Sequence, residues 1–341
     1  MSTPIILNVQ ALGNGPWPTI DPFLFCVHHN DAYPRGDAHM GPDAALTGRQ
    51  LGQDFAGKDG WSMYHGETVP GFPAHPHRGF ETVTIVRKGL IDHSDSLGAT
   101  ARFGGGDVQW LTAGKGIVHC EMFPLINTEA PNPTELFQIW LNLPAKNKMA
   151  EPHFTMLWNE DIPHRTVVDS AGRQTDIVSI AGTWAGASSL PPPPASWASE
   201  PDSELGICTL KIAPHAEWTL PAALHAGTRR QLYLFSGSGL SIHGTAVLPK
   251  SAIEVRADVP CTLTNGDTES EILVLQGRPI AEPVAQYGPF VMNTAAEIEQ
   301  TFADYRRTQF GGWPWGPGDP THPRGQQRFA RHADGRVQTP A

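Results

Sequence analysis

The sequence lacks the features that assign a chain to a membrane or a secreted class. It contains no apolar run of about 18 residues, the length needed to cross a bilayer as a helix. The amino terminus, Met1 to Pro4, has neither the basic start nor the apolar run of a secretory signal. Only four cysteines occur in 341 residues and none forms a C-x-x-C pair, which excludes a disulfide framework. We therefore expect a protein of the reducing cytoplasm that makes no membrane contact.

Positive charge is also scarce. The chain has 24 lysines and arginines against 34 aspartates and glutamates, which gives a formal net charge of −10. Binding to nucleic acid or to an anionic membrane surface relies on clustered basic residues, so direct contact with either is disfavoured. Long helices and coiled coils are excluded as well, because 35 glycines and 32 prolines interrupt regular elements.

Short apolar runs separated by glycine turns predict an all-β fold. Between residues 80 and 143, runs such as 82–86 and 108–111 alternate with glycine turns. This spacing is typical of a β-sandwich or barrel. The sequence GLIDH at 89–93 is echoed 150 residues later by GLSIH at 239–243. Together with the repeated strand rhythm, the echo favours two copies of one β fold.

A proline-rich stretch divides the chain. Pro191 to Pro194 lack the amide hydrogens that a sheet needs and favour an extended spacer. Farther on, Thr294-x-x-Glu297 is a capping-box pattern followed by an apolar stripe at helical spacing, which predicts one short helix. The expected organisation is an amino-terminal barrel at 1–187, a linker at 188–203, a second barrel ending in the helix at 204–315, and a tail at 316–341.

Two short motifs in the amino-terminal half are the candidate site. His75-Pro76-His77 and His119-Cys120-Glu121 each place two polar side chains at positions i and i+2, which share one face of a strand. If the two strands lie side by side, three imidazoles and one carboxylate converge. That donor set suits Fe, Mn, Ni, Cu or Zn better than Mg or Ca. On a six-coordinate ion it leaves two positions, for a substrate oxygen and for dioxygen.

A further carboxylate competes with Glu121 as a ligand at this site. Glu81 lies four residues after His77 and shares its face in an extended strand.

The second half of the chain has no equivalent of this cluster. A shift of 150 residues from the first histidine pair and Glu81 reaches His225, Gly227 and Gln231, and no His-x-His occurs in that half. The carboxyl-terminal barrel is therefore predicted to bind no metal.

The remaining polar candidates are interpreted as structural. His28 and His29 are adjacent, so they point to opposite faces of a strand. His93 and His243 occupy the echoed position and are assigned to turns. Arg78 alternates away from the metal face and is assigned to an ion pair or to the surface.

The sequence around these motifs resembles the pirin family. The resemblance rests on HPHRGFETVT from residue 75, DHSDSLG from residue 92 and GDVQWLTAGKGIVHCE at 106–121, with EPVAQYGPFVMNT at 282–294 in support. It covers most of residues 21–310. It implies a bicupin, which is two cupin-type β-sandwich barrels in one chain with the metal in the amino-terminal one.

The resemblance also implies a ligand set and an activity. The metal positions of the family match His75, His77, His119 and Glu121, so Glu121 is favoured over Glu81 as a ligand, and it could also act as a base. Fe(II) is the expected ion, with Mn, Ni, Cu and Zn left open. The implied activity is that of a quercetin 2,3-dioxygenase, with a flavonol or a related enolic small molecule and dioxygen as substrates. The alternative is a metal- and redox-responsive regulatory module that binds a protein partner.

Overall fold

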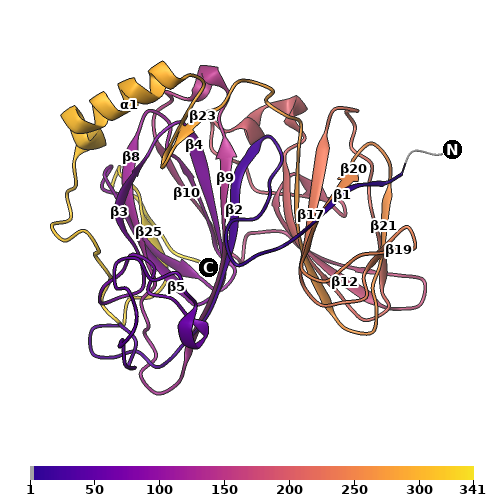
Figure 1. Cartoon of the computed structure of the whole chain (residues 1–341), viewed down its shortest axis with the longest axis horizontal. Coiled ribbons are helices and arrows are strands. Elements are labelled where there is room, and N and C mark those ends of the chain that lie inside the picture. The colour runs from indigo at the N-terminus through magenta and orange to yellow at the C-terminus, as the bar shows by residue number, and fades with distance from the viewer. Residues whose placement is uncertain (1–3) are drawn as a thin grey trace. The chain divides into compact units, whose positions relative to one another are not determined.

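The computed structural model describes residues 4–341, and most of its regular structure is β-strand (Figure 1). The fold divides into two compact units. Residues 28–138, 143–160 and 282–341 form the unit that we call the first barrel. Residues 4–27, 139–142 and 161–281 form the second barrel. The predicted all-β class with one short carboxyl-terminal α-helix is confirmed.

The first barrel is built from a six-stranded and a five-stranded sheet, with orders β26-β25-β6-β5-β8-β3 and β10-β7-β4-β9-β2. Buried side chains such as Val86, Ile91, Phe103, Leu111 and Phe123 form its core. The strands are β2 (Phe23–Tyr33), β3 (Gly71–His77), β4 (Phe80–Lys88), β5 (Leu90–Asp95), β6 (Thr100–Gly104), β7 (Val108–Thr112), β8 (Ile117–Met122), β9 (Asn132–Asn142), β10 (His153–Leu157), β25 (Phe329–Arg331) and β26 (Val337–Gln338). Two of them, β2 and β9, include residues that are assigned to the second barrel.

The second barrel is built from a seven-stranded and a four-stranded sheet, with orders β1-β20-β17-β22-β15-β12-β11 and β16-β21-β18-β19. Its core includes Leu210, Leu232, Ile253, Leu263 and Val274, which are all buried. The strands are β1 (Ile6–Ala11), β11 (His164–Val168), β12 (Gln174–Ala181), β15 (Gly206–Ile212), β16 (Glu217–Leu220), β17 (Arg229–Ser236), β18 (Ser241–Ile242), β19 (Thr245–Ala246), β20 (Ser251–Arg256), β21 (Cys261–Thr264) and β22 (Ser270–Gly277).

Short elements complete the chain. Two hairpins lie outside these sheets, and the remaining helical elements are single turns. They are β13 (Thr183–Trp184) with β14 (Ala187–Ser188), β23 (Ala285–Tyr287) with β24 (Phe290–Met292), α1 (Ala295–Thr308), and the 3₁₀ turns η1 (Lys58–Gly60), η2 (Ala145–Asn147), η3 (Trp197–Ser199), η4 (Pro201–Ser203) and η5 (Gln309–Gly311).

Helix α1 begins where the sequence predicts it. The Thr294 hydroxyl accepts a hydrogen bond from the Glu297 amide at 3.3 Å, and the Glu297 carboxylate accepts one from the Thr294 amide at 2.8 Å. This capping box satisfies two amides that would otherwise lack partners. Ile298 is buried, and Phe302 packs edge-on against Phe290 of β24. In the described part of the chain, no helix is both long and apolar enough to span a bilayer.

The carboxyl-terminal segment lies with the first barrel although it follows the second barrel in sequence. Strand β25 pairs with β6, which places the fully buried Ala330 opposite Ala101. The buried Arg102 donates to both carboxylate oxygens of Asp92 at 2.7 Å. It also donates to tail carbonyls, those of His322, Pro323 and Gln326, at 2.9–3.0 Å. The tail thus packs on the barrel, while the domain boundaries around 188–203 and 315 stay a prediction.

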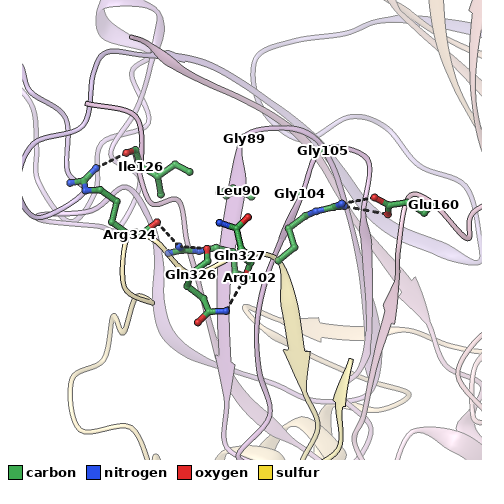
Figure 2. A pocket seen from close by; sticks show the side chains of 11 residues that line it. Gly89, Leu90, Arg102, Gly104, Gly105, Ile126, Glu160, Arg324, Gln326 and Gln327 are labelled. Carbon is green, nitrogen blue, oxygen red and sulfur yellow. Dashed lines mark hydrogen bonds and ion pairs between the residues drawn. The ribbon is translucent and has the colours of Figure 1, made fainter. Parts of the chain in front are cut away.

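A pocket of about 410 Å³ lies where the tail meets the turns that follow β4 and β6 (Figure 2). Arg324 donates to the carbonyl of Ile126 at 2.7 Å, and Arg328 forms ion pairs with Glu160 and Asp107. Since groups of the chain itself bind these guanidinium groups, we interpret the pocket as part of the surface on which the tail docks.

Candidate metal centre

Three strands of the six-stranded sheet bring the histidine motifs together. Strand β8 lies between β3 and β5. His75 on β3 is directly opposite His119 on β8, and a register shift separates His75 from Phe72 on the same strand. Residues opposite each other in antiparallel strands share a face, and His77 shares the face of His75 because it lies two positions on. The three imidazoles therefore meet on one side of the sheet, as the sequence predicts.

The geometry of the three rings suits a single cation. Each ring offers a nitrogen within 4.8 Å of a nitrogen of the other two. The Nε2 atoms of His75 and His77 are 3.1 Å apart. His119 is fully buried and His77 is 3% exposed. A divalent ion bound by imidazole sits about 2.0–2.1 Å from each nitrogen in the case of zinc, so small side-chain adjustments bring the three rings into ligand positions.

The hydrogen bonds of these rings indicate where their protons lie. Nδ1 of His75 is 2.8 Å from the carbonyl of Pro73, and Nδ1 of His77 is 3.4 Å from the carbonyl of Pro289. A carbonyl only accepts, so Nδ1 carries the proton in both neutral rings and each Nε2 presents a lone pair. Two lone pairs facing each other at 3.1 Å repel unless a cation lies between them. The donor set therefore fits a metal ion.

Burial keeps these imidazoles neutral. Desolvation lowers the pKa of His75 to about 4 and the pKa values of His77 and His119 well below the usual value for histidine. Neither ring nitrogen of His119 has a hydrogen-bond partner among residues 4–341. A buried polar group without a partner is costly. Neutral imidazole is the form that binds metals. A bound metal would therefore give one of the two nitrogens a partner and remove the cost at that atom.

Glu121 lies on the same strand face as His119 and is hydrogen-bonded. Its carboxylate accepts from Gln138 Nε2 at 2.6 Å and lies 2.9 Å from the hydroxyl of Thr84. It is 3% exposed, and burial raises its pKa. The ligand atoms that lie within 4.8 Å of one another belong to the three histidines and do not include this carboxylate. The assignment of Glu121 as fourth ligand therefore stays a prediction.

The competing carboxylate, Glu81, lies in the other sheet of the barrel. It is on β4, directly opposite Thr112 of β7, and its carboxylate accepts from that hydroxyl at 2.6 Å. It is fully buried. This contact is consistent with a structural role for Glu81, as is expected if Glu121 is the ligand.

A second buried pair, missed in the sequence, lies beside His119. Nε2 of His93 is 3.1 Å from a carboxylate oxygen of Asp95, and both side chains are fully buried. On β5 these residues lie opposite Glu121 and His119, respectively, and the rings of His93 and His119 are 5.5 Å apart. The turn assignment of His93 is therefore wrong. The i, i+2 spacing in Asp-His-Ser-Asp was the available signal, because it equals that of the two metal motifs.

The residue after His77 ties the site to the carboxyl-terminal segment. Arg78 is buried, and its guanidinium donates to the Asp304 carboxylate of α1 at 2.9 Å, which confirms the ion-pair interpretation. It also lies 4.5 Å from the ring centre of Phe310. Pro289, from the same segment, accepts the hydrogen bond from Nδ1 of His77. The segment thus fixes both the position of β3 and the orientation of one metal-facing ring.

This connection predicts that breaking the helix contact weakens metal binding. In an Asp304→Asn variant, Arg78 loses its charged partner and the strand end carrying His77 is less constrained. Groups that orient metal ligands typically change affinity by about 10–100-fold when mutated, and we expect about tenfold here. Competition with a chelator measures the affinity. Arg307→Gln is the matched control, since it breaks only the exposed contact to the same carboxylate; equal affinities in the two variants would contradict the connection.

Comparisons with known proteins agree with this fold. Residues 10–141 match the family model described as Pirin, and residues 207–311 match that of the Pirin C-terminal cupin domain. A Pseudomonas aeruginosa relative, provisionally named a quercetin 2,3-dioxygenase, is 35% identical over 240 residues, which cover 70% of this chain and 79% of the relative. Pirin of Homo sapiens is 33% identical over 260 residues, which cover 73% and 80%. A crystal structure of quercetin 2,3-dioxygenase from Acinetobacter baumannii gives a TM-score of 0.68 at 27% identity, covering 90% of this chain and 96% of that one.

Proposed function

This chain belongs to the pirin family of two-barrel cupins, and on that premise we propose that its first barrel binds one divalent transition metal, with Fe(II) as the native ion, and oxidises a flavonol or a related enolic small molecule with dioxygen. The observation that carries the proposal is the pair of Nε2 atoms of His75 and His77, 3.1 Å apart. Both rings hold their proton on the other nitrogen. His119 supplies the third nitrogen, and we assign Glu121 as the fourth ligand.

The protein residues prepare the site in two ways. Burial of the three imidazoles keeps them unprotonated, so no proton competes with the ion near neutral pH. Gln138 and Thr84 hold the Glu121 carboxylate in one orientation. When bound, the ion supplies the Lewis-acid and redox chemistry of the reaction.

Glu121 has a proposed second role as a proton acceptor. Burial raises the pKa of its carboxyl group above the usual value. A carboxylate with a raised pKa holds a proton more strongly, which suits removal of a proton from an enolic hydroxyl. The proton would move to the Oε atom that also accepts from Gln138 or to the one near Thr84.

The substrate class comes from the relatives. Quercetin 2,3-dioxygenase is the name of the Acinetobacter baumannii protein whose structure covers 90% of this chain, and it is the provisional name of the Pseudomonas aeruginosa relative. A flavonol offers an enolic hydroxyl, which is the group whose proton Glu121 would accept.

We also propose that this protein is located in the cytoplasm. Its four cysteines are free thiols, and thiols stay reduced in that compartment.

Oxygen consumption tests this proposal directly. Metal-free protein is loaded with one equivalent of Fe(II) without oxygen, and quercetin is then added in aerated buffer. We expect oxygen uptake that requires both the ion and the flavonol, with about one dioxygen consumed per flavonol, as in other enzymes that insert both oxygen atoms. Parallel loading with Mn, Ni, Cu and Zn determines which ion supports turnover.

Two outcomes would count against parts of the proposal. Protein that binds one iron per chain but consumes no oxygen with any flavonol or simple enolic compound would contradict the enzymatic function. If such protein captured a partner only in one oxidation state of the metal, the regulatory module would replace the enzyme as the function. Absence of bound metal under all loading conditions would contradict the site itself.

A further inference from the structure

The interior of the second barrel contains a buried arginine. Arg230 lies on β17 and is 1% exposed. Leu232 and Leu234, two and four positions on, belong to the core of this barrel. Since alternate residues of a strand share a face, the side chain of Arg230 points into the barrel interior. Arginine is almost never buried to this degree without a partner of opposite charge.

The partners of this guanidinium are neutral oxygens. Nε and Nη2 donate to Oε1 of Gln276 at 2.8 and 2.6 Å, and Nη2 also donates to the carbonyl of Pro221 at 2.7 Å. Gln276 is held in place because its amide nitrogen donates to the carbonyl of Glu204 at 3.2 Å. Nη1 is sealed from solvent and has no hydrogen-bond partner in the described part of the chain. One end of the guanidinium is therefore fixed, and the other presents free N–H groups.

No neighbouring group places a negative charge in contact with this guanidinium. No carboxylate oxygen lies within 4.0 Å of this guanidinium among residues 4–341. Glu204 acts on it only at longer range, and its carboxylate accepts from the amides of Leu224 and His225. The thiols of Cys208 and Cys261 lie close enough to interact with it, but burial raises the pKa of Cys261 to about 11 and that of Cys208 further, so both are neutral near pH 7.

We propose that Nη1 of Arg230 binds a small monovalent anion, of the size of chloride or of a carboxylate group, inside the second barrel. A water molecule would satisfy the free N–H groups but would leave the buried guanidinium without a negative charge in contact with it, which is the larger cost. An anion satisfies both. The same charge repels cations, which gives a physical reason for the single metal site expected in this chain. The two barrels would then hold ions of opposite sign at sites built from different residue types.

Anion-dependent stability of the full-length protein tests the proposal. The protein is transferred to sodium gluconate, whose anion is much larger than chloride or formate, and chloride or formate replaces gluconate at constant ionic strength. Binding to the native state alone raises the melting temperature, so we expect a rise that saturates with chloride or formate. Comparison of the two ions distinguishes a halide site from a carboxylate site, and either supports the proposal. Equal melting curves in all three salts would overturn it.

Two variants separate the site from general salt effects. Arg230→Gln removes the charge and should abolish the shift. Arg229→Gln is the matched control, since the neighbouring side chain is 41% exposed and pairs with Glu254, and it should keep the shift. If Arg230→Gln does not fold, bromide soaked into crystals of the unchanged protein gives the answer through its anomalous signal. A bromide within hydrogen-bond distance of Nη1 supports the proposal, and water alone at that position contradicts it.

Discussion

An His119→Ala variant is expected to lose metal binding and, with it, oxygen uptake. His119 is the central ligand because it lies on β8, opposite His75, and its ring is also 4.9 Å from that of His77. Neither of its nitrogens has another partner among the described residues, so its removal leaves no protein hydrogen bond unmade. The change should therefore affect the ion far more than the fold. Elemental analysis after anaerobic loading measures the occupancy.

The control for this variant is a histidine of similar chemistry far from the site in sequence. His215 has an exposed side chain, 3.5 Å from Asp267 in the second barrel, and His215→Ala should bind one ion per chain like the unchanged protein. We expect less than a tenth of that occupancy in His119→Ala at equal metal concentration. A fall from above nine tenths to below one tenth requires a rise in Kd of about 80-fold or more, which corresponds to more than about 2.6 kcal/mol of binding free energy. Full occupancy in His119→Ala would disprove the proposed site.

The same measurement distinguishes the two carboxylates. Glu121→Gln keeps the shape and removes the charge, so a ligand role predicts a loss of metal affinity. If Glu121 acts only as a base, the ion stays bound and only turnover falls. Glu81→Gln should leave the occupancy unchanged, because that carboxylate is bonded to Thr112 in the other sheet. Metal loss in Glu81→Gln and not in Glu121→Gln would reverse the assignment made from the family resemblance.

The histidine cluster was predictable because it depends on local rules. Strand alternation places His75 and His77 on one face, and a single strand pairing brings His119 opposite them. The fate of Glu121 was not predictable in this way. Its hydrogen-bond partners, Thr84 and Gln138, come from β4 and β9, and no local pattern says which polar groups of other strands will reach a given carboxylate.

The support from the carboxyl-terminal segment was beyond the sequence for a different reason. Pro289 and Asp304 are separated from His77 and Arg78 by more than 200 residues, with the second barrel between them in the chain. Periodicity identified helix α1 correctly, but it identifies only the apolar face and not the surface on which that face packs. The glycine- and proline-rich composition of the tail likewise gave no sign of strand β25 and its pairing with β6.

The largest effect on stability is expected at Arg102. An Arg102→Met variant leaves the fully buried Asp92 carboxylate without its charged partner. Breaking a buried ion pair from one side typically costs about 3–5 kcal/mol. The tail carbonyls of His322, Pro323 and Gln326 lose their donor as well. We expect a fall of that size in the free energy of unfolding in urea and faster proteolysis within residues 316–341. The control is Arg35→Gln, since both side chains of the Arg35–Asp43 pair are exposed, and such pairs contribute only about 0–1 kcal/mol.

A second substitution separates the buried charge from the loss of tail contacts. If most of the cost in Arg102→Met comes from the uncompensated Asp92, then adding Asp92→Asn should restore part of the lost stability, because an amide is cheaper to bury than a carboxylate. If the lost tail contacts dominate, the double variant should be no more stable than Arg102→Met, and the tail should remain sensitive to protease. Recovered stability with a still-sensitive tail would mean that Arg102 serves the barrel through Asp92 and the tail through its carbonyl contacts as two separable functions. A stable Arg102→Met protein with a protected tail would contradict both contributions, since it would show that strand β25 and its pairing with β6 hold the segment without the arginine.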